Sequence, residues 1–173
     1  MKNIVLTGFM GTGKTTVGQI LAEKLKRKFL DTDQIIEEKL GTSIKEFFKK
    51  AGETKFREIE AKTIALISNI EDAVISCGGG VTVNPVNIEN LKKNGIIINL
   101  FASPEHIFKR LCKDNTRPLI KQMDNPLEGI KKLLSKRQKA YENCDFTVNT
   151  DNLTSEQVVE NILENKLIKD ILK

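Results

Sequence analysis

The sequence predicts an α/β fold of three layers, in which helices cover both faces of a central five-stranded parallel sheet. Short apolar runs alternate with amphipathic stretches, and the clearest strand signals fall at residues 4–6, 28–30, 73–77, 96–101 and 146–148. The intervals between them are long enough for the crossover helices that parallel strands require. The chain has 173 residues, 39% of them hydrophobic, so we expect one domain over residues 1–173.

The first predicted strand leads directly into a glycine-rich segment, residues 8–15, with the sequence Gly-Phe-Met-Gly-Thr-Gly-Lys-Thr. This segment matches G-x-x-x-x-G-K-[ST], whose backbone N–H groups surround phosphates while Lys14 reaches the β and γ phosphates and the Thr15 hydroxyl can hold magnesium. Apolar residues at helical spacing follow: Val17, Ile20, Leu21 and Leu25. This context favours a phosphate-binding loop, a P-loop, over a chance glycine-rich turn.

The second predicted strand is followed by Asp31, Thr32 and Asp33. On an extended segment, two carboxylates at i and i+2 point the same way, so one could serve the water shell of a metal and the other could accept from a substrate hydroxyl. Asp33 fits equally well as the N-cap of the helix that follows. The third strand lacks the terminal Asp that P-loop proteins commonly use for magnesium, so Asp31 is the better metal candidate.

The third predicted strand ends at Cys77 and continues into Gly78, Gly79 and Gly80. Three residues without side chains would let a ligand lie directly on the backbone and use its N–H groups. A plain turn is the alternative, because glycine runs are weak signals.

Four arginines stand out because the chain otherwise uses lysine heavily: Arg57, Arg110, Arg117 and Arg137. Arginine suits bidentate contact with carboxylates and phosphates, although any one of them could be a solvated surface residue. Arg117 lies in residues 113–124, a segment without a regular apolar period. Such segments are often lids, and a solvated loop is the alternative reading.

Several helix ends are signalled locally. Ser43 with Glu46 and Thr154 with Gln157 resemble capping boxes, and two prolines, at 85 and 104, occupy first helical positions. Residues 154–173 look like one amphipathic helix without functional information. Its predicted core-facing residues are Val158, Val159, Ile162, Leu163 and Leu167.

Composition narrows the classes of function. The net charge of +5 is spread along the chain, and aromatic residues are only 5% with no Trp, which argues against nucleic-acid binding. Cys77, Cys112 and Cys144 are widely separated, so neither a disulfide framework nor a zinc site is expected. No secretory signal or membrane-spanning run is evident, which favours a cytoplasmic location. His106, the only histidine, is interpreted as structural.

Taken in order, these motifs resemble the shikimate kinase family over most of the chain up to about residue 148. The resemblance rests on the P-loop, on Asp31 and Asp33, on the glycine run, and on two arginine motifs. These motifs are Phe56-Arg57 with Glu60, and Arg137 with Tyr141. The family pattern near the second arginine usually contains proline, where this chain has Lys139, so the presentation of Arg137 differs from the common form.

The resemblance implies a P-loop NTPase fold of the nucleoside monophosphate kinase type with a lid, and transfer of the ATP γ-phosphate to the 3-hydroxyl of shikimate in aromatic amino-acid biosynthesis. It implies catalytic roles for Lys14, Asp31, Asp33 and Arg117. The implied ATP-binding residues are Gly11, Thr12, Gly13, Lys14, Thr15, Thr16, Arg110 and Arg117. The implied shikimate-binding residues are Asp33, Arg57, Gly79, Gly80 and Arg137. Magnesium would be held by Thr15 and, through water, by Asp31.

Three other functions remain open at this point. One is a kinase for gluconate or a nucleoside monophosphate, although Asp33 with two arginines favours a small hydroxylated carboxylate. Another is a non-catalytic nucleotide-binding module, and a third is nucleic-acid binding through the basic surface. We expect ATP and shikimate as partners, no nucleic acid, no membrane, and a monomer.

Overall fold

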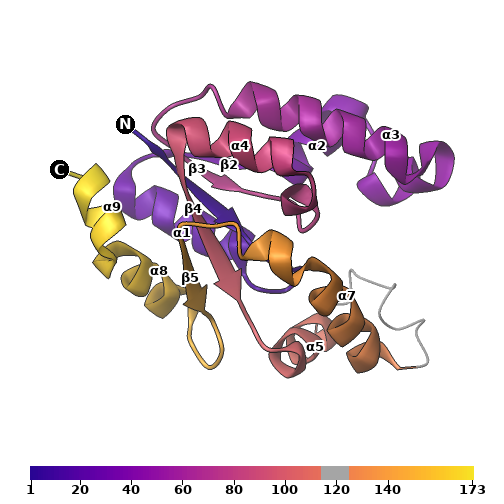
Figure 1. Ribbon diagram of the computed structural model, residues 1–173. Coiled ribbons are helices and arrows are strands. Elements are labelled where there is room, and N and C mark those ends of the chain that lie inside the picture. Colours follow the sequence, from indigo (N-terminus) through magenta and orange to yellow (C-terminus); the bar gives the residue numbers. More distant parts are fainter. Residues whose placement is uncertain (114–124) are drawn as a thin grey trace.

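The protein is described by a computed structural model that covers residues 1–113 and 125–173. Its centre is a five-stranded parallel sheet in the order β2-β3-β1-β4-β5 (Figure 1). The strands are β1 (Asn3–Thr7), β2 (Lys28–Asp31), β3 (Ala73–Ser76), β4 (Gly95–Phe101) and β5 (Phe146–Asn149). All five predicted strands and their parallel arrangement are therefore confirmed.

Helices cover both faces of this sheet, which confirms the predicted three layers (Figure 1). On one face, α1 (Lys14–Leu25), α8 (Ser155–Glu164) and α9 (Lys166–Ile171) pack over strand residues that include Ile4 and Ile98. On the other face, α2 (Thr32–Leu40), α3 (Ile44–Ile67) and α4 (Pro85–Asn94) pack over residues that include Val5 and Ile97. The three central strands, β3, β1 and β4, are largely apolar because both of their faces are buried, whereas the edge strands β2 and β5 are partly exposed.

A third apolar cluster lies beyond the end of β4. There α5 (Pro104–Lys113) packs against α7 (Pro126–Tyr141), with Phe9 of the P-loop and Ile107 among the buried residues. A short 3₁₀ turn, η1 (Val81–Val83), follows the glycine run. The predicted lid segment, including Arg117, lies outside the described residues apart from its first position, at the end of α5.

Local signals explain most helix ends. Thr154 and Gln157 form a complete capping box, while at Ser43 the structure shows its hydroxyl accepting from the Glu46 N–H. Asn84 caps α4 ahead of Pro85, as the Asn-Pro sequence predicts. In α3 the helical backbone is interrupted at Gly52, which has φ of 79°. A left-handed φ of this kind is readily adopted only by glycine.

One packing prediction was wrong. The C-terminal helix is divided at Asn165, whose side chain caps the second piece, α9. Because the break changes the helical phase, Ile168 is buried and Leu167 is 44% exposed. Among the residues that the structure describes, no helix is long and apolar enough to cross a membrane.

Candidate active site

The P-loop follows β1 at the carboxyl edge of the sheet, where parallel α/β proteins build their ligand sites. Gly8, Gly11 and Gly13 all have positive φ, and a Cβ at Gly8 would strike the carbonyl oxygen of Leu100. The loop therefore depends on glycine both for its conformation and for its close approach to β4. Gly13 is also the N-cap of α1, so the positive end of this helix faces the loop.

The lysine of the loop is folded against the loop itself. Lys14 Nζ donates to the carbonyl oxygen of Phe9 at 2.9 Å, and the Thr12 hydroxyl donates to the same oxygen at 2.8 Å. Lys14 is only 9% exposed, so its charge is directed into the site rather than to solvent. A buried ammonium beside the loop N–H groups provides the positive field that polyphosphates require.

Thr15 and Asp31 are joined directly. The Thr15 hydroxyl donates to Asp31 Oδ2 at 2.9 Å, while Asp31 Oδ1 accepts from the N–H groups of Asp33 and Gln34. Asp31 is thus the N-cap of α2, and Asp33 lies in the first helical turn rather than on an extended segment. The expected geometry of the pair is corrected, yet both side chains line the same cavity.

The glycine run makes room for two of the predicted site residues. A Cβ at Gly78 would overlap the Asp33 carboxylate, and one at Gly80 would overlap the Arg57 guanidinium, whereas one at Gly79 would meet only ordinary contacts. The run therefore does more than expose backbone to a ligand. It allows an acidic and a basic side chain to reach the same edge of the sheet.

Arg57 is held in place by two acidic side chains one helical turn away on either side. Its guanidinium donates to Glu60 at 2.9 Å through Nη1 and to Glu53 at 2.9 Å through Nη2. The Glu60 side chain is 2% exposed, and its desolvation raises the pKa of this carboxyl against the opposing effect of Arg57. Arg57 also lies over the Phe56 ring at 5.3 Å, a cation–π distance that further fixes the guanidinium.

Arg137 and Tyr141, one turn apart on α7, both donate to the Gly79 carbonyl oxygen. The distances are 3.2 Å from Arg137 Nη1 and 2.7 Å from the Tyr141 hydroxyl. Desolvation raises the pKa of Tyr141, so the phenol remains a neutral donor. The proline missing before Tyr141 thus does not prevent α7 from bringing Arg137 to the glycine run.

Two cavities meet at the P-loop. One, of about 420 Å³, is lined by Lys14, Thr15, Asp31, Asp33 and Gly79 among others, and we call it the acceptor cavity. The other, of about 310 Å³, is lined by Thr12, Arg110, Thr150 and Ser155 among others, and Gly13 and Thr16 line both. The P-loop thus separates two compartments, as a nucleotide bridging them would require.

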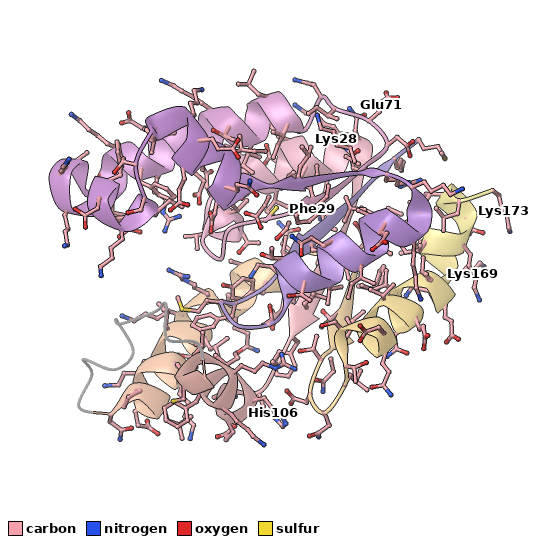
Figure 2. The ribbon with its side chains drawn as sticks, turned by 180° about the vertical axis from the view of Figure 1, so that it is seen from behind. Lys28, Phe29, Glu71, His106, Lys169 and Lys173 are labelled. Carbon is pink, nitrogen blue, oxygen red and sulfur yellow. The ribbon has the colours of Figure 1, made fainter. Side chains whose placement is uncertain are left out.

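The second cavity includes Thr150 and Ser155, which the sequence did not indicate, beside Arg110, which it did. Arg110 donates to Thr150 through both Nη atoms, at 3.0 and 2.6 Å, and to the Gly11 carbonyl oxygen at 3.3 Å. One turn earlier on α5, His106 lies beside the same β5–α8 loop, with Nε2 at 3.0 Å from Asn152 Oδ1 (Figure 2). The signal that could have revealed this loop is its position, because it follows the carboxyl end of β5.

Known proteins resemble this chain in sequence and in fold. The family model described as shikimate kinase matches residues 10–166. The chain belongs to the shikimate kinase family. Among curated family members, the shikimate kinase of Caldicellulosiruptor bescii is 50% identical over 170 residues, covering 98% of each chain. That of Thermodesulfovibrio yellowstonii is 49% identical over 164 residues, covering 95% of this chain and 94% of the relative.

Solved structures of family members share the fold. The shikimate kinase of Acinetobacter baumannii, solved in complex with shikimate, has a TM-score of 0.90 and 37% identity, covering 100% of this chain and 96% of its own. The Aquifex aeolicus shikimate kinase has a TM-score of 0.81 and 36% identity, covering 93% and 94% of the two chains. The predicted P-loop fold of the nucleoside monophosphate kinase type is confirmed by these family members.

Proposed function

We propose that this protein transfers the γ-phosphate of ATP to the 3-hydroxyl of shikimate, giving shikimate 3-phosphate and ADP. The observation that carries the proposal is the acceptor cavity, where the P-loop Lys14 and the carboxylates of Asp31 and Asp33 share one space. Arg57 and Arg137 reach the glycine run at its edge. Paired arginines suit a carboxylate, and a carboxylate such as Asp33 suits the hydroxyls of the same small molecule.

The residues present fit a magnesium ion. Mg²⁺ is usually held in kinases by one or two protein oxygens, by water and by substrate phosphates. The Thr15 hydroxyl and Asp31 Oδ2 are 2.9 Å apart at the start of α1, which places a hydroxyl and a carboxylate together beside the loop. We propose that Thr15 binds the metal directly and Asp31 through water, where the ion would neutralise phosphate charge.

The nucleotide is proposed to lie across the P-loop. Backbone N–H groups between Gly11 and Thr16 bind the phosphates, and Lys14 leaves the Phe9 carbonyl oxygen to contact the transferred phosphoryl group. The base of the nucleotide lies in the second cavity, where Arg110 supports the loop around Thr150 by hydrogen bonding. In this orientation the γ-phosphate faces the acceptor cavity. We propose that Arg117 also contacts the phosphates of the nucleotide.

The transfer step then needs little covalent assistance. The 3-hydroxyl oxygen attacks the γ-phosphorus, the bond from that phosphorus to the bridging oxygen breaks, and the hydroxyl proton passes to the Asp33 carboxylate. Arg57 and Arg137 bind the shikimate carboxylate, while the backbone at Gly79 and Gly80 approaches the ring. Most of the rate enhancement would come from positioning and charge neutralisation.

A coupled ADP-release assay tests the proposal. Purified protein is supplied with ATP, magnesium and one acceptor at a time: shikimate, gluconate, or a nucleoside monophosphate. We expect turnover with shikimate and none with gluconate or a nucleoside monophosphate. Turnover with either other acceptor but not with shikimate would overturn the substrate assignment, and tight nucleotide binding without any acceptor-dependent turnover would indicate a non-catalytic module.

We also propose that the protein acts as a monomer in the cytoplasm without nucleic-acid or membrane partners. Sedimentation at working concentration would test the monomer. Retention on DNA that falls steeply with salt would contradict the expected lack of nucleic-acid binding.

A further inference from the structure

A third hollow in the structure is not used by the proposed reaction. It is a groove of about 500 Å³ between α7 and the ends of β4 and β5. Within residues 1–113 and 125–173, it shares no lining residue with the acceptor cavity and only Thr12 with the second cavity. Its volume is within the range of small-molecule sites, which bind ligands in concave and mostly apolar pockets. We call it the α7 groove.

The α7 groove combines apolar walls with a polar floor. One helix face supplies Leu134 and Tyr141, and Phe9 and Phe101 add aromatic rings. On the floor Asn99 and Thr147 are direct partners of neighbouring strands, so their side chains lie side by side. A flat apolar body between these walls would face an amide and a hydroxyl.

Asn99 is the unusual member of this floor. It interrupts the apolar strand β4 and is only 7% exposed. Among the described residues its side chain makes one long hydrogen bond, from Nδ2 to the Thr147 hydroxyl at 3.5 Å. Buried amides normally have good partners, because an unpaired polar group is costly to remove from water. The amide therefore offers both a donor and an acceptor to a molecule in the groove.

Among the lining residues that the structure describes, the charged groups lie toward the ends of the α7 face of the groove. Lys131 and Glu142 are eleven residues apart on one helix, which separates them by about 16 Å along its axis. Lys131 already lies 3.5 Å from both Glu105 and Glu128. A charge on the body of a ligand would therefore be desolvated without an opposite charge nearby, which favours a neutral occupant.

Two walls of the groove also belong to the machinery of the active site. The Phe9 carbonyl oxygen accepts from Lys14, and the Tyr141 hydroxyl donates to the Gly79 carbonyl oxygen. An occupant that presses on the rings of Phe9 and Tyr141 would therefore change how Lys14 and Gly79 are held. Phe9 and Tyr141 thus connect the groove to the proposed active site through contacts of single residues.

We propose that the α7 groove is an effector site for a neutral aromatic compound whose edge carries an amide-like donor and acceptor, and that its occupation changes the rate of phosphoryl transfer. The ring would lie between Leu134 and the aromatic walls, and its polar edge would pair with Asn99 and Thr147. This site is separate from the proposed ATP and shikimate sites.

The binding test uses benzamide as the probe and ¹⁵N-labelled protein without nucleotide or shikimate, followed by NMR. We expect saturable shifts centred on α7 and β5, with a dissociation constant on the order of 1 mM for so small a ligand. Toluene lacks the polar edge and benzoate is charged, so each should bind about tenfold more weakly. Asn99→Leu should remove the preference for benzamide over toluene.

Matched variants of α7 locate the site without relying on a core substitution. Ser135 is exposed and lines the groove, so Ser135→Phe should fill it and abolish benzamide binding. Lys136 is its exposed neighbour that does not line the groove, so Lys136→Phe should bind as the natural protein does. No saturable binding, equal binding by Ser135→Phe, or filling of the groove by a second copy of the chain would each overturn the proposal.

The effect of groove occupation on phosphoryl transfer is measured by the ADP-release rate with and without saturating benzamide. We expect at least about a twofold change in the natural protein and in Lys136→Phe, and no change in Ser135→Phe. An unchanged rate with an occupied groove would overturn the effector role. Since binding is measured without substrates, these outcomes are separate from any failure of the proposed kinase activity.

Discussion

Replacing Gly80 by alanine tests whether the glycine run exists to admit the Arg57 side chain. A Cβ at this position would overlap the guanidinium, and its three nearest atoms all belong to Arg57. The guanidinium can move aside only by giving up its contacts with Glu60 and Glu53, both at 2.9 Å. We therefore expect Gly80→Ala to displace the guanidinium and weaken the proposed clamp on the shikimate carboxylate.

The size of the effect follows from the contacts that are lost. A charge-assisted hydrogen bond contributes about 1.5–3 kcal/mol, which corresponds to a rise of about 10- to 150-fold in the KM for shikimate. Displacing Arg57 also leaves the buried Glu60 carboxyl less well paired, at a cost of about 1–3 kcal/mol in unfolding free energy. For a chain of this length each kcal/mol lowers Tm by about 2–4 °C.

The assay is ADP release at varied shikimate with saturating ATP, alongside thermal unfolding. Gly78→Ala is the matched catalytic variant, because its methyl group would displace Asp33 and should lower kcat more than it raises KM. Gly79→Ala is the folding control, since the nearest atom to its added Cβ is Met10 N at an ordinary 3.5 Å, and its Tm should be unchanged. An unaltered shikimate KM in Gly80→Ala would refute the reasoning.

Four further outcomes are expected. Lys14→Ala should abolish turnover with Tm nearly unchanged, and retained turnover would remove the P-loop from the mechanism. Asp31→Asn should raise the magnesium concentration for half-maximal rate about 10-fold, and an unchanged magnesium titration would exclude this role. Tyr141→Phe should be about 1 kcal/mol less stable at neutral pH. Desolvation raises the pKa of Tyr141 above 10.0 in the folded state, so the unfolded state loses this proton first as the pH rises. The stability difference between the natural protein and Tyr141→Phe, measured by urea unfolding, should therefore shrink above pH 10. His106 lies 3.0 Å from Asn152 of the β5–α8 loop, and we expect this contact to hold the loop in place. His106→Ala should therefore raise the KM for ATP and leave that for shikimate unchanged, and the reverse split would contradict this expectation.

The elements of the fold could be predicted because their signals are local. The P-loop needs its glycines within eight residues, and the three central strands are largely apolar runs bounded by polar or glycine residues. The division of the C-terminal helix was missed because Asn165 is not a strong breaker by composition. Its effect appears only once the side chain caps α9 and shifts Leu167 to the surface.

The positions of the proposed site residues were less accessible than their identities. The sequence indicated Asp31 and Asp33 as a pair, but whether the second lies on a strand extension or in a helix depends on where α2 begins. Likewise, three successive glycines do not reveal that the first and the third make room for side chains from α2 and α3. Such packing is set by tertiary contacts rather than by local propensity.

The part that the loop around Thr150 plays in the second cavity was also hard to predict from the sequence. It has no recognisable motif, and its part in the second cavity comes from Arg110, which is forty residues earlier in the chain. Only the rule that ligand sites lie at the carboxyl ends of parallel strands could have pointed to it.

The central position of β1 has a consequence for synthesis on the ribosome. The P-loop emerges before the neighbours of β1 in the sheet, because β1 is hydrogen-bonded on both sides by strands made later, β3 and β4. Gly8 also lies against Leu100, near the end of β4. Domains with such long-range pairing fold slowly, because chain entropy is lost before the contacts form. A nascent chain that ends before about residue 101 should therefore have a complete nucleotide-binding motif in its sequence and no nucleotide site in its structure.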